Sequence, residues 1–230
     1  MSSNIEKVQM VAQALGEIRE QVVFVGGSIG ELYVEKPELT DIRATIDVDC
    51  VVDLVSYLDY GKLEEQLRKL GFQNDTSQGA PICRKIYKGI LVDIMPVNPN
   101  ILGFGNIWYK NGVESKVSVV LPNGVSIFIL PVEYYVATKL EALKDRGGRD
   151  IRTSHDWEDI VYILNNCKTL LQNFQDCNDK KLKNYLKEKF DEIVGRENPK
   201  EDVQAVLPYN SDEENIKEIL NLMKKLQNIS

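Results

Sequence analysis

The chain has 230 residues, of which 43% are hydrophobic and 27% are charged, as expected for one large or two small soluble globular domains. Its net charge of −7 excludes a globally basic surface, so any contact with RNA would depend on a local basic patch. Four cysteines without a CxxC spacing and a single histidine argue against a structural zinc site and against a disulfide framework.

The longest apolar stretch, residues 117–136, is interrupted by Pro122, Asn123, Gly124 and Pro131. A bilayer-spanning helix needs about 20 consecutive apolar residues, so this stretch is not expected to cross a membrane. The first residues have no signal-peptide pattern, so we expect none. We therefore expect a cytoplasmic protein without a membrane partner.

The first half of the chain mixes helical and strand patterns. The predicted elements, in chain order, are a helix at 3–19, a strand at 22–25, the start of a helix at 29–34, a strand at 45–54, a helix at 57–70, and two hairpins formed by 82–87 with 90–95 and by 117–121 with 125–130. Ser56 and Asp59 resemble a capping box for the helix at 57–70, and Gly71 is a suitable C-cap. Lys88-Gly89 turns the first hairpin.

The second half shows only helical patterns, at 131–145, 155–166, 178–194 and 211–228, with a linker expected at 197–210. We therefore predict an α+β fold. A mixed β-sheet with flanking helices would occupy residues 1–130, and a C-terminal helical bundle would occupy residues 131–230.

Three acidic residues stand inside predicted apolar strands. Asp47 and Asp49 are two residues apart, so their side chains share one face of a strand. Asp93 lies between Val92 and Ile94, where an apolar residue would pack better. Carboxylates converging from adjacent strands would bind Mg²⁺, or Mn²⁺, through oxygen. In the alternative reading, Asp47 and Asp49 are solvent-facing residues on an edge strand.

A Gly26-Gly27-Ser28 turn follows the predicted strand at 22–25. Backbone N–H groups and a hydroxyl at such a turn can bind phosphate. The turn matches neither the Walker A nor the Rossmann pattern, and strand-to-helix turns also carry glycine for steric reasons alone.

The order of strand, Gly-Gly-Ser, helix, Asp-x-Asp strand and later strand Asp resembles the nucleotidyltransferase (polymerase-β-like) superfamily. The segment Lys139–Ile160, KLEALKDRGGRDIRTSHDWEDI, is similar to the final motifs of AbiEii/AbiGii-type nucleotidyltransferases, which include MenT-like toxins. The resemblance covers residues 20–165 and implies a nucleotidyltransferase fold. The 18 residues between Ser28 and Asp47 exceed the usual spacing, so a protruding loop is expected near residues 36–40.

By this resemblance, Asp47 and Asp49 would hold the metal that bridges a triphosphate. Asp93 would bind a second metal or act as a base toward an acceptor hydroxyl. Gly26, Gly27 and Ser28 would bind the β- and γ-phosphates of the nucleotide.

The final motifs add a second group of residues. Lys139 would supply positive charge to the triphosphate, and Arg146 and Asp156 would hold Lys139 or the nucleotide in place. The last functional position of the motif falls on Asp156, at the start of a helix, with Asp159 as the alternative.

The implied activity is Mg²⁺-dependent transfer of a nucleoside monophosphate from an NTP to an acceptor, with release of pyrophosphate. The acceptor could be the 3′ end of tRNA, in a toxin–antitoxin or phage-defence protein with a cognate antitoxin. Antibiotic-like small molecules and protein hydroxyls are alternative acceptors. Two other classes stay open: a non-catalytic nucleotide-binding module on the same fold, and a purely structural protein with surface acids.

Overall fold

The computed structural model describes residues 2–146, 150–209 and 211–229, and the side chains of residues 145 and 146 lie outside the description. The chain forms two compact units. The first comprises Met1–Glu31 and Ala44–Pro131, and the second comprises Leu32–Arg43 and Val132–Ser230. The sequence-based division at residue 130 placed residues 32–43 in the first domain, whereas the structure groups them with the second unit.

The first unit is built on a mixed sheet that has seven strands among the described residues, in the order β3-β4-β5-β2-β1-β7-β6. The strands are β1 Val22–Val25, β2 Asp47–Val52, β3 Gln73–Asn74, β4 Arg84–Tyr87, β5 Ile90–Pro96, β6 Val117–Val120 and β7 Ser126–Ile129. β2 pairs in parallel with β5, and β1 pairs in parallel with β7, while the other neighbours are antiparallel. The centre of the sheet is therefore β5-β2-β1, and all four residues of β1 are buried.

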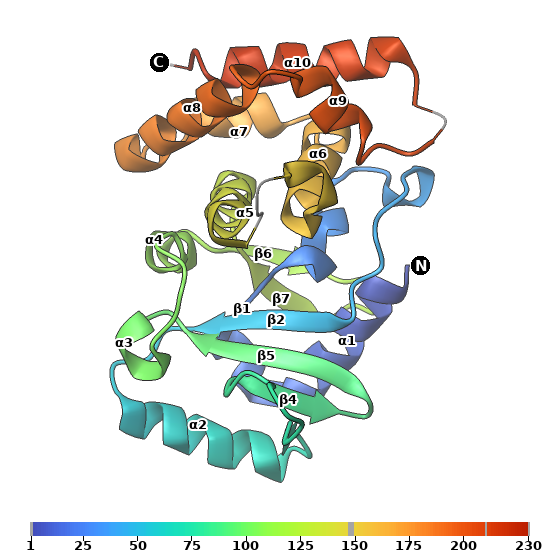
Figure 1. Ribbon diagram of the computed structural model, residues 1–230. Helices are drawn as coiled ribbons and strands as arrows, with labels where there is room; N and C mark the ends of the chain where they lie inside the picture. The colour runs from blue at the N-terminus through green and yellow to red at the C-terminus, as the bar shows by residue number, and fades with distance from the viewer. Residues whose placement is uncertain (1, 147–149, 210, 230) are drawn as a thin grey trace. The chain divides into compact units, whose positions relative to one another are not determined.

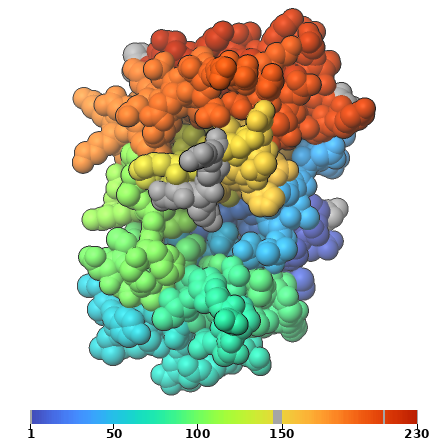
Figure 2. All heavy atoms as spheres, in the orientation of Figure 1, coloured from blue at the N-terminus to red at the C-terminus, as the bar shows by residue number. Residues whose placement is uncertain are grey.

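Helices flank this sheet (Figure 1). They are α1 Ser3–Leu15, α2 Tyr57–Lys69, α3 Pro99–Leu102 and α4 Tyr109–Glu114. The chain also forms short 3₁₀ segments. η1 Gly16–Gln21 and most of η2 Gly27–Tyr33 belong to the first unit, and the end of η2 and η3 Pro37–Leu39 belong to the second. Helix α1 contacts β2, and the Tyr60 hydroxyl of α2 donates to the carbonyl oxygen of Ile94 in β5 at 3.2 Å. The connection between β3 and β4 lies on the face seen in the space-filling view (Figure 2).

The local signals of this half are confirmed. Ser56 caps α2 by accepting a hydrogen bond from the Asp59 N–H at 3.2 Å, and Gly71 after the helix has a positive φ of 91°. Lys88 and Gly89 turn the β4–β5 hairpin with φ of 48° and 82°. The first predicted helix was too long: α1 ends at Leu15, because Gly16 adopts φ 55° and the chain continues as 3₁₀ helix.

The second unit is helical. It contains α5 Val132–Arg146, η4 Ile151–Thr153, α6 His155–Asn166, α7 Leu170–Asp176, α8 Lys180–Val194, α9 Pro199–Gln204 and α10 Glu213–Leu226. Helix α5 packs against α6, α7 and α8, and α10 packs against α6 to α9. The α+β class is confirmed: a mixed sheet flanked by helices, followed by a helical C-terminal region. None of the helices in the described ranges is both long and apolar enough to cross a membrane.

The predicted linker at 197–210 was wrong in part. It contains α9, whose Val203 is fully buried, and the Trp157 indole N–H of α6 donates to the Asp202 carbonyl oxygen at 2.7 Å. A short helix with two buried residues has too few apolar positions to show a helical period in the sequence.

Candidate functional site: an acidic cluster on the central strands

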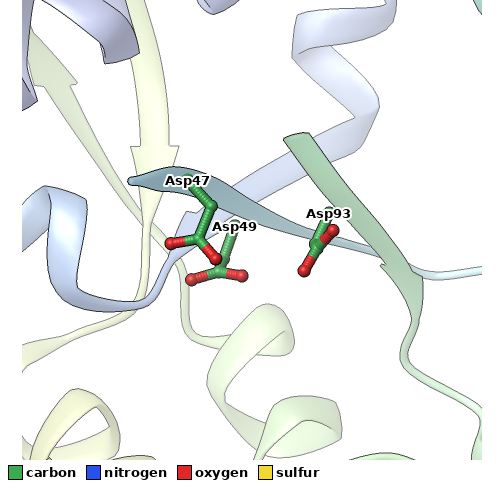
Figure 3. A group of neighbouring side chains, drawn as sticks. All are labelled: Asp47, Asp49 and Asp93. Carbon is green, nitrogen blue, oxygen red and sulfur yellow. The ribbon is translucent and has the colours of Figure 1, made fainter. Parts of the chain in front are cut away.

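The three strand carboxylates meet on the central strands (Figure 3). Asp49 of β2 lies directly opposite Asp93 of β5 in the parallel register, and Asp47 is two residues earlier on the same face. Carboxylate oxygens of Asp47, Asp49 and Asp93 all lie within 4.8 Å of one another. Because β2 lies between β1 and β5, the edge-strand reading of this pair is wrong.

The cluster has the donors that a divalent cation requires. Mg²⁺ and Mn²⁺ are bound in proteins chiefly by carboxylate oxygens, and carboxylates this close repel one another unless a cation lies between them. Asp93 is 7% exposed, so water screens its charge poorly. The residues present therefore fit a divalent metal site, and the Mg²⁺ or Mn²⁺ ion expected from the sequence stays a prediction.

Cys50 follows Asp49 in β2, so its side chain lies on the opposite face of the strand. It is fully buried, and burial, followed by the negative charges of Asp49 and Asp93, raises the pKa of its thiol well above the usual value. The thiol is therefore neutral at physiological pH. Because successive side chains of a strand point to opposite faces, Cys50 faces away from the three carboxylates, and carboxylate oxygens are the donors that the cluster offers.

Arg84 in β4 is a member of the site that the sequence analysis missed. Its Nε and Nη2 donate to the two oxygens of Asp93 at 2.8 and 2.7 Å, and Nη2 also lies 3.3 Å from Asp47 Oδ2. The hydrogen bonds with Asp93, followed by the charges of Asp93, Asp47 and Asp49, raise the pKa of Arg84 further above its usual value, against the effect of partial burial. Arg84 therefore interacts with the whole acidic cluster.

A signal for Arg84 was present in the sequence. With Lys88 and Gly89 as a two-residue turn, Tyr87 pairs with Ile90, and three residues further along Arg84 pairs with Asp93. Directly opposed residues of an antiparallel pair share a face of the sheet. Counting the register of the predicted hairpin would have placed the guanidinium beside the carboxylate.

The Gly26-Gly27-Ser28 turn lies against the cluster. Val25, the last residue of β1, pairs with Asp49, and a Cβ placed on Gly26 would lie 2.0 Å from Asp49 Oδ2. Ser28 is 1% exposed, and its Oγ has no hydrogen-bond partner among the described residues. A buried hydroxyl without a partner is uncommon and calls for a ligand or a water, so the turn has the features of a phosphate site beside the carboxylates.

Gly26→Ala tests this close approach. Gly26 has φ 75°, where an L-residue is strained by about 1–2 kcal/mol, and the added methyl group would also displace the Asp49 carboxylate. The matched control is Gly124→Ala, because Gly124 has φ 81° with no atom within 4 Å of the added methyl. We expect Gly26→Ala to lose at least as much stability as Gly124→Ala in urea denaturation, and Gly26→Ala alone to weaken Mn²⁺ binding, by about tenfold or more. Equal Mn²⁺ affinity in the two variants would contradict the contact.

The residues of the final motifs gather in the second unit. Lys139 of α5 lies 2.6 Å from Asp159 Oδ2 and 3.3 Å from Asp156 Oδ1, both on α6. The three residues are 8%, 4% and 7% exposed, respectively. Both candidates for the last position therefore contact Lys139, and Asp159 is the nearer. Arg146 is the last residue of α5, and its side chain lies outside the described residues.

Arg43 also belongs to this charged cluster and was not predicted. Its Nη2 lies 3.3 Å from Asp159 Oδ1, and its Nε lies 3.3 Å from Glu158 Oε2. The preceding segment is tied to α6 as well, since the Thr40 and Tyr162 hydroxyls are 2.8 Å apart. These contacts explain why residues 32–43 fold with the second unit although the sequence places them between two strands of the first.

Comparison of the chain with protein-family models finds no match, and comparison with curated proteins finds no significant similarity. The functional interpretation therefore depends on the residues of the site and on the motif order along the chain.

Proposed function

We propose that the chain is a divalent-metal-dependent nucleotidyltransferase that transfers a nucleoside monophosphate from an NTP to an acceptor hydroxyl and releases pyrophosphate. The observation that carries the proposal is the convergence of Asp47, Asp49 and Asp93 from neighbouring parallel strands beside the Gly26–Ser28 turn. The motif order resembles the AbiEii/AbiGii-type group of the nucleotidyltransferase superfamily.

In this proposal Asp47 and Asp49 hold the divalent cation, which would neutralise and orient the phosphates of the NTP. Ser28 offers a buried hydroxyl to a phosphate oxygen, and the absence of a side chain at Gly26 lets the turn approach Asp49. The roles expected of Lys139, Arg146 and Asp156 toward the nucleotide stay predictions.

The acceptor that the motif resemblance favours is the 3′ end of tRNA, in a toxin or defence protein of the cytoplasm with a cognate antitoxin as partner. The net charge of −7 gives no general attraction for RNA, so the acceptor would be bound locally. A small molecule such as an aminoglycoside, or a protein hydroxyl, would use the same transfer chemistry.

A transfer assay tests the proposal. Purified protein is incubated with Mg²⁺ and each α-³²P-labelled NTP, with and without total tRNA, beside Asp47→Ala as the inactive control. We expect label on tRNA, with one nucleotide preferred, from the wild type only. Equal labelling by wild type and Asp47→Ala would contradict the proposal. An NTP-dependent rise in melting temperature with no transfer to tRNA, to aminoglycosides or to protein would favour a non-catalytic nucleotide-binding module.

A further inference from the structure

Arg84 occupies the positions at Asp93 that a metal ion would use. Its guanidinium forms two parallel hydrogen bonds, from Nε to Oδ1 and from Nη2 to Oδ2 of Asp93, at 2.8 and 2.7 Å. This bidentate pairing is the strongest geometry available between arginine and a carboxylate. A cation bound by both oxygens of Asp93 would have to replace it.

The strand pairing holds Arg84 in this position. Arg84 and Asp93 face each other in the β4–β5 ladder, so the contact needs no rearrangement of a loop. The next residue, Lys85, points to the opposite face, where it pairs with Glu64 and Asn74 and is 2% exposed. Both sides of β4 are thus anchored, which fixes the register that presents the guanidinium to the cluster.

Arg84 also makes a second divalent cation at Asp93 unfavourable. It supplies one positive charge within contact distance of Asp47 and Asp93, two of the three carboxylates. A second divalent ion would face Arg84 at close range and would be repelled by it.

From this geometry we infer that the cluster holds a single divalent cation, between Asp47 and Asp49, and that Arg84 takes the place of a second metal ion at Asp93. The inference depends on the proposed function only for the metal site. It makes Asp93 a positioning residue that orients Arg84, in place of the sequence-based expectation that Asp93 is a metal ligand or a base.

Arg84 can also contact the substrate of such a site. The contacts with Asp93 and Asp47 use Nε and Nη2, and Nη1 carries two further N–H donors for which the described part of the chain provides no acceptor. A guanidinium held by a carboxylate on one side can donate to a phosphate oxygen on the other. The ligand class expected at Nη1 is therefore the phosphate chain of a nucleotide.

Mn²⁺ titration of the full-length protein, followed by electron paramagnetic resonance, tests the inference. We expect one Mn²⁺ per chain for the wild type and for Arg84→Lys, which keeps the charge. Arg84→Met should bind a second Mn²⁺, or bind the first about tenfold more tightly, because a positive charge has been removed. Asp93→Asn should still bind one ion. The matched control is Arg68→Met, an exposed arginine of α2, which should behave as the wild type.

The results separate this inference from the proposed function. Two ions of similar affinity in the wild type, or unchanged binding by a folded Arg84→Met, would overturn the inference while leaving a nucleotidyltransferase intact. Should Arg84→Met not fold, the loss of the single ion in Asp93→Asn would overturn it in the same way. One ion in the wild type and two in Arg84→Met, without transfer to any acceptor, would uphold the inference and reject the proposed activity. A wild type that binds no Mn²⁺ would overturn both.

Discussion

Asp49→Asn is expected to reduce nucleotide transfer by about a thousandfold or more, while the melting temperature of the metal-free protein stays unchanged or rises. The amide keeps the shape of the side chain but removes a charged metal ligand, and losing a few kcal/mol of transition-state stabilisation suffices for such a loss. Stability should not fall, because relief of the repulsion between Asp49 and its carboxylate neighbours within 4.8 Å offsets the lost attraction to Arg84.

The control for this variant is Asp53→Asn, which removes an exposed acid just beyond the end of the same strand. It should keep full transfer and an unchanged melting temperature, because exposed charges contribute little. The measurement pairs a single-turnover transfer assay with thermal unfolding in chelator and in Mg²⁺. If Asp49→Asn kept transfer at the level of Asp53→Asn, the carboxylate cluster would not be the active site. If its metal-free stability fell sharply, the carboxylate would be a structural residue.

Local features of the fold could be predicted from the sequence because each depends on neighbouring residues. The capping of α2 by Ser56 and the turn at Lys88-Gly89 follow from side-chain chemistry and allowed dihedral angles over two to four residues. The shared face of Asp47 and Asp49 follows from the period of a strand. None of these depends on the rest of the chain.

Features that depend on which strands become neighbours were harder to predict. The meeting of Asp49 with Asp93 requires β2 and β5 to pair in parallel, although the chain forms α2 and two other strands between them. Sequence periodicity carries no information on that choice. The hypothesis of convergence came from three acids placed in apolar strands, and the motif resemblance added to it. Arg84, in contrast, could have been found by counting three residues along the register of the predicted hairpin, from the Tyr87–Ile90 pair to the Arg84–Asp93 pair.

The second unit shows the same division. Its four long helices were predicted from their apolar period, but the contacts of Arg43 with Glu158 and Asp159 join residues more than a hundred positions apart. The segment 32–43 has no strong period of its own, so its place beside α6 is set by a hydroxyl pair and ion pairs. Such contacts become visible only when the fold is known.

The charged cluster of the second unit leads to the other large prediction. Lys139→Met should destabilise the second unit by about 3–5 kcal/mol, because it leaves the buried Asp156 and Asp159 without the ammonium group that lies 3.3 and 2.6 Å from them. The measurement is urea denaturation followed by the fluorescence of Trp157, which is buried on the same helix as the two acids.

Two further variants determine whether the loss arises from removing the Lys139 ammonium group from the two acids. Lys144→Met removes an exposed lysine of the same helix and should cost less than about 1 kcal/mol. The double variant Lys139→Met with Asp159→Asn should recover part of the stability, since one of the two carboxylates that lose Lys139 is neutralised together with the lysine. A Lys139→Met protein as stable as Lys144→Met would mean that the acids do not depend on Lys139 for neutralisation. The fold would then not need the Lys139 ammonium group, and the expected role of Lys139 in binding the triphosphate of a nucleotide would gain support.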